Sequence, residues 1–324
     1  MASEALYRNE AGAVKATAAA AHVSAEVVQL PDGRAGVYEG QATATSGDVK
    51  SYRTSGHFAI KKSTSVSFLP GCRVYWDASA SQAVVVPGNG DFYLGIAVDD
   101  AAAADTTVRV DLNCPPKADW TLQGPCLGAA TLLETNCNAY GQGIVTRPGG
   151  EVHLVFDTTS EAATASIEAE GSGGEQIVSE KYIFEAIVEV QDDGDAAALD
   201  FNIGIASDGH ATDADSIAES VFFHLDGNDL NIFAESDDGT TEVAATDTTK
   251  DLVLNTPFHL WIDARTRSDI QLYVDGVNVL PNSTFTLAAA TGPLKALVHL
   301  EKTTSTTGAH YKILDMRVRR VDAE

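Results

Sequence analysis

Apolar residues in this chain recur at every second position over short runs, and this spacing limits the possible folds more than any other feature. Every second residue from Tyr182 to Val190 is apolar, while Glu185 and Glu189 lie between them. A period of two is that of a β-strand with one buried face, whereas a helix repeats about every 3.6 residues. Long stretches of Leu, Lys and Glu at helical spacing are missing, so the sequence predicts an all-β fold.

Turn-forming residues separate these runs at regular intervals. Pro31-Asp32-Gly33 and Asp226-Gly227-Asn228 are typical examples, because Gly, Asn and Asp tolerate positive φ and Pro fixes its own φ. The pattern predicts strands at 26–30, 36–38, 57–60, 73–76, 83–86, 92–98 and 107–112, and then at 151–156, 181–190, 199–206, 221–225, 230–234, 258–264, 270–274, 296–300 and 311–321.

The chain is long enough for two domains, each with its own core. A Pro-Pro pair at 115–116 ends strand pairing, so we place a domain at 1–113, a Pro-containing linker at 114–119 and a second domain at 120–324. The longer strands of the second domain predict a β-sandwich. Residues 158–174, which are rich in Ser, Thr, Glu, Ala and Gly, are expected to form a mobile loop.

The formal charge of −25 is unevenly divided between the two domains. Residues 1–113 hold 9 Lys and Arg against 12 Asp and Glu, which leaves 21−9=12 against 46−12=34 for the remainder. Such an acidic surface repels phosphate backbones, so no nucleic-acid binding is expected. No apolar run approaches the roughly 20 residues that span a bilayer, and the N-terminus lacks a signal-peptide core. We therefore expect synthesis in the cytoplasm and no membrane insertion.

The four cysteines, Cys72, Cys114, Cys126 and Cys137, include no Cys-x-x-Cys pair and no His at zinc-finger spacing. This spacing favours reduced structural thiols. A cross-link or metal site among the last three cysteines is the alternative.

Candidate catalytic residues are few. Glu185 and Glu189 share one strand face, but four residues of strand separate them by about 13 Å, whereas retaining glycosidases hold their carboxyl groups about 5 Å apart. We interpret both as solvated charges. His224 and His259 alternate with apolar neighbours and are interpreted as outward-facing or satisfied interior residues rather than bases. No catalytic residue and no enzymatic activity are predicted.

Acidic clusters at 192–195, 213–215 and 226–229 contain the oxygen ligands that calcium prefers. They are equally typical of turns and fit no EF-hand loop, so no metal ligand and no cofactor are assigned, with calcium kept as an alternative. Exposed aromatic rings can stack on sugars, and Trp120, Tyr140 and Tyr273 are the candidate glycan contacts.

Four segments of the first domain carry a family resemblance: the opening Ala-Leu-Tyr-Arg-Asn-Glu at 5–10, Leu-Pro-Gly-Cys-Arg-Val-Tyr-Trp-Asp at 69–77, Leu-Gly-Ile-Ala-Val at 94–98 and Thr-Thr-Val-Arg-Val at 106–110. In order and spacing, residues 1–113 resemble the capsid cement, or head decoration, proteins of tailed bacteriophages. The resemblance implies a small, tulip-like β-barrel that binds the major capsid protein on the outer capsid surface, commonly as a homotrimer.

Leu6, Tyr7 and Arg8 lie in an N-terminal arm that is expected to contact a shell subunit. An arm can add a strand to a neighbouring sheet or anchor in it. Packing of Leu6 and Tyr7 on their own barrel is the alternative.

The second domain resembles the concanavalin A-like and laminin-G-like jelly rolls through Phe-Glu-Ala at 184–186, Leu-Tyr-Val-Asp-Gly at 272–276 and Ile-Leu-Asp-Met-Arg-Val at 313–318. The whole chain is thus expected to be a virion decoration protein that stabilises the head, with a projecting lectin-like domain that binds host or environmental glycans. The alternatives are a soluble lectin or glycoside hydrolase whose N-terminal module is an accessory, and a second domain that serves only as a spacer.

Overall fold

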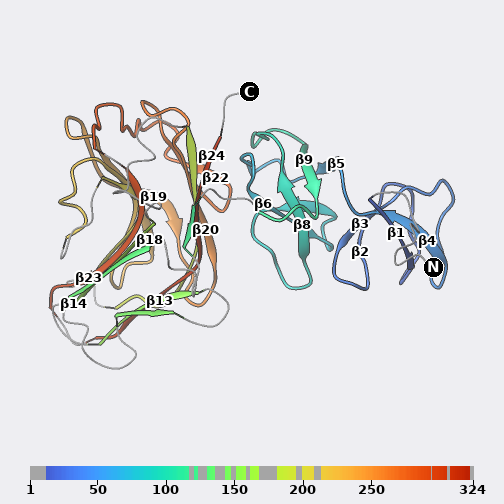
Figure 1. Cartoon of the computed structure of the whole chain (residues 1–324), viewed down its shortest axis with the longest axis horizontal. Helices are drawn as coiled ribbons and strands as arrows, with labels where there is room; N and C mark the ends of the chain where they lie inside the picture. Colours follow the sequence, from blue (N-terminus) through green and yellow to red (C-terminus); the bar gives the residue numbers. More distant parts are fainter. Residues whose placement is uncertain are drawn as a thin grey trace, which may run out of the picture. The chain divides into compact units, whose positions relative to one another are not determined.

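The protein is all-β, as its alternating sequence predicts. The computed structural model describes residues 12–116, 120–122, 130–135, 143–146, 151–157, 161–167, 181–194, 199–207, 213–292, 294–304 and 307–321. These residues form antiparallel sheets and contain no α-helix (Figure 1). No helix in this part of the chain is long and apolar enough to cross a membrane.

The chain divides into two compact units, Met1–Lys117 and Ala118–Glu324, here called unit 1 and unit 2. Unit 1 contains two small sheets. The four-stranded sheet has the order β1 (Ala13–Thr17), β4 (Val49–Arg53), β3 (Ala35–Tyr38), β2 (Val27–Gln29). The five-stranded sheet has the order β5 (His57–Lys61), β9 (Thr107–Leu112), β8 (Phe92–Ala97), β6 (Arg73–Asp77), β7 (Gln82–Val84).

The edges of the five-stranded sheet approach each other. An isolated parallel bridge joins Lys62, directly after β5, to Ala83 in β7. Strand β9 alternates as its sequence predicts, with Val108, Val110 and Leu112 buried. The tulip-like barrel implied for the whole of this module stays a prediction.

Asn113 links the two sheets of unit 1. It follows β9 in a left-handed conformation with φ of 56°. Its Oδ1 accepts a hydrogen bond from the Ala35 backbone N–H at 2.9 Å, and its Nδ2 donates to the carbonyls of Ala35 at 2.9 Å and Thr54 at 2.8 Å. One side chain therefore connects the end of the five-stranded sheet to β3 and to the residue that follows β4 in the other sheet.

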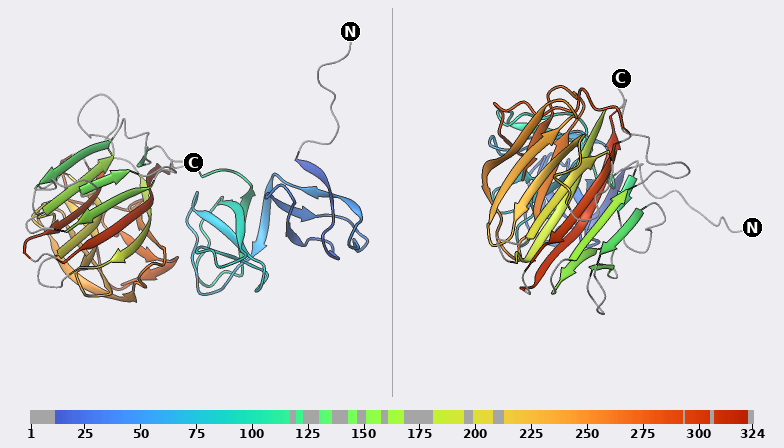
Figure 2. Two further views of the ribbon diagram at one scale, coloured as in Figure 1. Left: turned by 90° about the horizontal axis from the view of Figure 1, so that it is seen from below. Right: turned by 90° about the vertical axis from the view of Figure 1, so that its left-hand side faces the viewer.

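Unit 2 is a sandwich of two sheets (Figures 1 and 2). The seven-stranded sheet has the order β11 (Ala130–Thr135), β14 (Glu161–Ile167), β23 (Lys295–Lys302), β16 (Leu199–Ala206), β17 (Ser220–Asp226), β18 (Asn231–Asp237), β19 (Glu242–Asp251). The eight-stranded sheet has the order β12 (Gly143–Thr146), β13 (Val152–Phe156), β24 (Ala309–Arg320), β15 (Tyr182–Asp192), β20 (Phe258–Asp263), β21 (Gln271–Val274), β22 (Val277–Val279), with β10 (Trp120–Leu122) also paired to β24.

The core of unit 2 lies between these sheets and takes side chains from both. Phe201 of β16 stacks on Tyr311 of β24 with ring centroids 4.5 Å apart. The predicted β-sandwich is therefore confirmed. In the right-hand view of Figure 2, β24 (red) runs between β13 (green) and β15 (yellow), which matches its central place in the eight-stranded sheet.

The prediction of a mobile loop at 158–174 is wrong in part. Residues 161–167 form β14, which lies inside the seven-stranded sheet between β11 and β23. Its small residues suggested flexibility, but Ala162 and Ala163 are buried, and strand partners on both sides satisfy the backbone.

Removing the Asn113 side chain should loosen unit 1. We expect Asn113→Ala to lower the free energy of unfolding by about 2 kcal/mol or more, because three hydrogen bonds are lost and their partners are left unpaired. Differential scanning calorimetry should show the transition of unit 1 several degrees lower, with that of unit 2 unchanged. Asn113→Gly keeps the positive φ without strain, so it should cost less than Ala. Asn113→Asp keeps the acceptor but places a carboxylate oxygen against the carbonyls of Ala35 and Thr54, so it should not restore stability. Equal stability of the Ala variant and the native chain would contradict the linking role.

Candidate functional site

Polar side chains gather on the outer face of the seven-stranded sheet because the inner face is filled by the core. In β16, Phe201 and Ile203 point into the core, so Asp200 and Asn202 point outward. The neighbouring β17 follows the same rule, and register pairs its His224 with Asn202. Strand alternation alone thus places acidic, amide and imidazole groups side by side.

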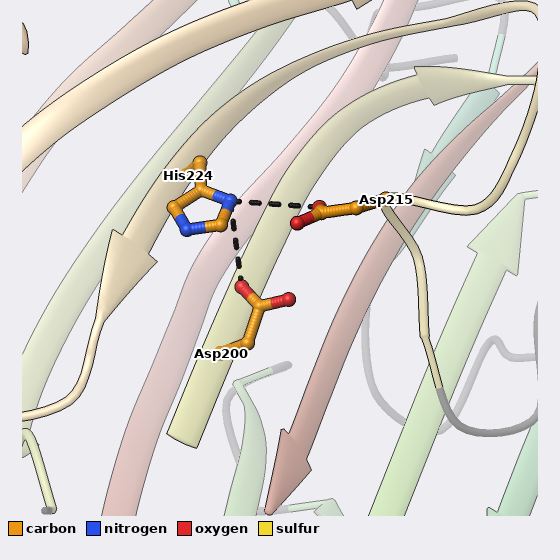
Figure 3. A group of neighbouring side chains, drawn as sticks. All are labelled: Asp200, Asp215 and His224. Carbon is orange, nitrogen blue, oxygen red and sulfur yellow. Dashed lines mark ion pairs between the residues drawn. The ribbon is translucent and has the colours of Figure 1, made fainter. Parts of the chain in front are cut away.

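Three carboxylates surround one nitrogen of His224. The ring Nδ1 lies 3.5 Å from Asp200 Oδ1, 3.5 Å from Asp215 Oδ1 and 3.6 Å from Glu235 Oε1. Figure 3 shows Asp200 and Asp215 both directed at this nitrogen. The four residues come from β16, the segment before β17, β17 itself and β18, and together they are called the carboxylate–histidine cluster.

Packing next to the cluster holds Asp215 over the sheet. Its neighbours Ala214 and Ile217 are buried against Phe222 and Leu297, which lie on the same outer face. The apolar end of this face therefore anchors the segment that carries Asp215, and the polar end receives its carboxylate.

Two further groups orient the cluster. Asn202 Nδ2 donates to Asp215 Oδ1 at 2.8 Å and to Asp200 Oδ2 at 3.1 Å. The other ring nitrogen of His224, Nε2, lies 3.2 Å from Asp226 Oδ1. Within the described part of the chain, His224 Nδ1, Glu235 Oε1 and Asn202 Oδ1 are buried and have no hydrogen-bond partner.

The close packing of acidic groups alters their protonation. Burial lowers the pKa of His224, but its contacts with Asp215 and Glu235 and the charge of Asp200 outweigh burial and raise the pKa to about 12. Burial raises the pKa of Asp200 to about 8, and the charge of His224 offsets this only in part. Burial also raises the pKa of Glu235, whereas contact with His224 holds that of Asp215 below its usual value despite burial.

The donor atoms of Asp200, Asp215 and His224 lie within 4.8 Å of one another, so these three residues could hold a metal ion. Of the acidic clusters singled out in the sequence, 213–215 contributes Asp215, and 226–229 contributes Asp226 as the partner of His224. Asp192 instead accepts a hydrogen bond from the Gly194 backbone. Asp200, Glu235 and the role of His224 were missed. The available signal was an Asp-x-Asn run and a His-x-Asp run on two consecutive strands.

The two glutamates weighed as a catalytic pair are held by basic residues on β24. Glu185 is fully buried, with Oε1 2.5 Å from Arg317 Nη2 and Oε2 2.6 Å from Arg319 Nη1. Glu189 lies 2.6 Å from Lys312 Nζ. The expectation that both are solvated is therefore wrong, because β24 runs alongside β15 and carries basic residues opposite them.

Most of the predicted capsid and glycan contact residues lie outside the part of the chain that the structure describes. Leu6, Tyr7, Arg8 and Tyr140 lie outside the described residues. The backbone of Trp120 pairs with Val318 of β24, and its side chain lies outside the description. The candidate glycan contact Tyr273 is only 9% exposed, and its ring packs against Trp261 with centroids 6.0 Å apart.

Unit 1 contains a cavity of about 600 Å³ beside β2. Residues 23–29 line one side, and Trp76 and Phe92 from the five-stranded sheet line the other. Strand β2 is an edge strand that pairs only with β3 among the described strands, and its residues belong to the lining of this cavity. An unpaired edge is a template for an added strand.

Residues 8–112 match the family described as phage cement protein. The resemblance predicted for the first domain is confirmed over these residues, which lie within unit 1. No curated protein matches the sequence.

Three solved structures are similar to part of this chain. Alginate lyase AlgAT5 of polysaccharide lyase family 7 shares 15% identity at a TM-score of 0.44, covering 61% of this chain and 96% of that one. The potassium-bound carbohydrate recognition domain of Emp46p shares 12% at 0.39, covering 60% and 89%. Carbohydrate-binding module CBM66 from Bacillus subtilis shares 9% at 0.36, covering 59% and 95%. At these TM-scores, the sandwich assignment rests on the strand pairings of unit 2.

The electrostatics of the cluster predict an imidazole that keeps its proton in the absence of a bound cation. The pKa of His224 is raised from 6.5 to about 12, so the stability contributed by the charged ring is complete below pH 6.5 and is lost as pH rises towards 12. The pKa of Asp200 is raised from 3.8 to about 8. The stability that its protonated carboxyl contributes is therefore complete below pH 3.8 and is lost as pH rises through 8. Nitrogen-15 chemical shifts of the ring across a titration measure the first effect.

The matched variant is His224→Gln, which cannot take up a proton. It should remove the corresponding resonances and should flatten the fall in unfolding free energy between about pH 7 and pH 10. A His224 ring that loses its proton near its ordinary pKa in the native chain would contradict this description.

Proposed function

We propose that this protein decorates a bacteriophage capsid, with unit 1 bound to the shell and unit 2 projecting from it. The match of residues 8–112 to phage cement proteins is the observation that carries this proposal. It implies a location in the virion, at the outer capsid surface. The major capsid protein would be the partner, and burial of surface across subunit boundaries would stabilise the head.

Unit 1 would attach through its N-terminal arm, with Leu6, Tyr7 and Arg8 as the contact residues. Aromatic and Arg side chains are favoured at the centres of interfaces, where truncation of a few residues removes most of the binding energy. A homotrimer would place three such arms on one shell position and raise the effective concentration of each. The cavity beside β2 offers a further surface on which a shell segment could add as a strand.

Unit 2 would be the outward part of the particle. It carries about −22 of the formal charge, since 12 basic residues face 34 acidic ones after residue 113. The acidic surface keeps neighbouring copies soluble and disfavours nucleic acid. Weak binding of host or environmental glycans would gain strength from the number of copies on one particle.

No catalytic role belongs to this proposal. Glu185 and Glu189, the carboxylates considered for glycoside hydrolysis, are both engaged by Arg or Lys side chains. A general acid needs a raised pKa and access to substrate, and a fully buried carboxylate bridged by two arginines has no such access.

Capsid binding is tested with the full chain and expanded capsids that lack it. We expect co-sedimentation of the native protein with these capsids. The double variant L6A/Y7A should bind at least tenfold more weakly, because two anchors of more than about 1 kcal/mol each are removed. Val253→Ala is the matched control, since Val253 is an apolar residue of unit 2 that is 64% exposed. Failure of the native chain to bind the capsids would refute decoration, and undiminished binding of L6A/Y7A would refute the arm as the contact.

Glycan binding is tested separately on an array, with the protein displayed in many copies. Tyr273 is buried, so stacking on sugar rings would fall to Trp120 and Tyr140. We expect W120A/Y140A to lose array binding while Tyr273→Phe keeps it. No binding by the displayed native protein would leave unit 2 as a spacer.

A further inference from the structure

We propose that the carboxylate–histidine cluster of unit 2 binds a divalent transition-metal ion, with Zn²⁺ as the reference ion and Asp200, Asp215 and His224 as its ligands. The inference goes beyond capsid decoration and does not depend on it, because the cluster belongs to unit 2 and the cement-protein match belongs to unit 1.

The spacing of the donor atoms is that of ligands around a common ion. His224 Nδ1 is 3.5 Å from both Asp200 Oδ1 and Asp215 Oδ1. Hydrogen bonds from nitrogen to oxygen are mostly 2.7–3.2 Å long, so these contacts are too long to be good ones. Ligands bound at about 2.0–2.1 Å in a tetrahedral zinc site lie about 3.4 Å from each other. The observed separations fit the edges of such a site.

The orientation of His224 is that of a metal ligand. Its Nε2 is placed to donate a hydrogen bond to Asp226 Oδ1 at 3.2 Å, which directs Nδ1 towards Asp200 and Asp215. Histidines that bind metals almost always donate their other N–H to a carboxylate, a carbonyl or water. Asp226 is thus a positioning residue for the imidazole.

Buried polar atoms at the cluster lack the partners that a folded protein normally supplies. His224 Nδ1 is buried without a hydrogen-bond partner in the described structure, and its side chain is more than nine-tenths buried. Glu235 Oε1, at 3.6 Å from that nitrogen, is buried and unpartnered as well. A buried polar group without a partner has a cost in the free energy of folding. A cation between them would remove this cost.

The carboxylates around the nitrogen also have one basic group between them. Among the described residues, no Lys or Arg lies within ion-pair distance of Asp200, Asp215 or Glu235, and His224 is the basic group they share. Two other buried carboxylates of unit 2 have Lys or Arg partners: Glu185 has two arginines and Glu161 has Lys302 at 3.4 Å. The cluster differs from these because its carboxylates converge on an imidazole.

The ligand types select the ion. Ca²⁺ and Mg²⁺ prefer oxygen ligands alone, whereas an imidazole nitrogen suits Zn²⁺ and its first-row neighbours. Two carboxylates and one imidazole supply three ligands of types that zinc accepts, and three protein ligands leave the fourth tetrahedral position open. Bound there, the ion would tie the segment of Asp215 to strands β16 and β17.

Isothermal titration of the chelator-treated full chain with ZnCl₂ tests the site. A second histidine pair, His153 and His310, has ring nitrogens 3.0 Å apart, so all measurements use a His310→Gln background. We expect one Zn²⁺ per chain and a melting temperature several degrees higher with excess ZnCl₂. D200N and H224Q should each weaken binding about 100-fold or more, and D226N about 10–100-fold.

Matched controls are D213N and H57Q. Asp213 lies in the same segment as Asp215, and His57 is an exposed histidine of unit 1. Both variants should keep the native affinity within twofold. Zinc binding that survives D200N and H224Q, or no zinc binding by the His310→Gln chain, would overturn the proposal. Binding of CaCl₂ in preference to ZnCl₂ would overturn the choice of ion.

X-ray absorption of the zinc-loaded His310→Gln chain gives a test that needs no change in the cluster. It should show one imidazole nitrogen and oxygen ligands at about 2.0–2.1 Å and no sulfur. A spectrum with two imidazoles or with sulfur would place the ion elsewhere and refute the assignment. This test stays decisive even if a cluster variant fails to fold. Capsid co-sedimentation reports on unit 1 alone, so a failure of either proposal is distinguishable from a failure of the other.

Discussion

The contact between the two apolar faces of unit 2 determines where its chemistry can lie. The strands β16, β17 and β23 of the seven-stranded sheet give one set of alternate residues to the core, so the polar residues of their other set point outward. This geometry places Asp200 on β16 and His224 on β17, while Phe201 and Phe223 occupy the core. A shift of one residue in either strand would bury the charge and expose the aromatic ring. The stability of the core therefore fixes the register of the carboxylate–histidine cluster.

The same alternation explains why much of the fold could be predicted from sequence. Strands with a clear apolar period, such as β15, β16 and β9, were predicted close to their observed bounds. Strands without that period were missed: β1 and β4 are short and mixed, β19 is polar, and β14 is rich in small residues. These segments form strands because their backbones pair with neighbours that are distant in sequence. A local sequence pattern does not reveal which neighbour a segment will pair with.

The cluster was less accessible to prediction because it depends on which strands are neighbours. Asp200 and Glu235 are 35 residues apart and lie on strands separated by β17, so their convergence on His224 follows from sheet order. Glu185 gives the converse case, because an apparently solvated charge became a buried ion pair once β24 was placed beside β15. Sequence alternation indicates on which face of the sheet a side chain lies. The long-range pairing of strands determines which side chains are its neighbours on that face.

The segment that carries Asp215 contacts both the apolar and the polar part of the outer face of the seven-stranded sheet. Ala214 and Ile217 pack on Phe222 at the apolar end, and Asp215 between them reaches the polar end. A carboxylate held on both sides by packed neighbours loses little further freedom when it contacts His224, so its approach costs less entropy than that of a free loop. Hydrophobic packing thus supplies the positional accuracy, and electrostatics determines what the site attracts. The surface that results is built from residues of unit 2 alone.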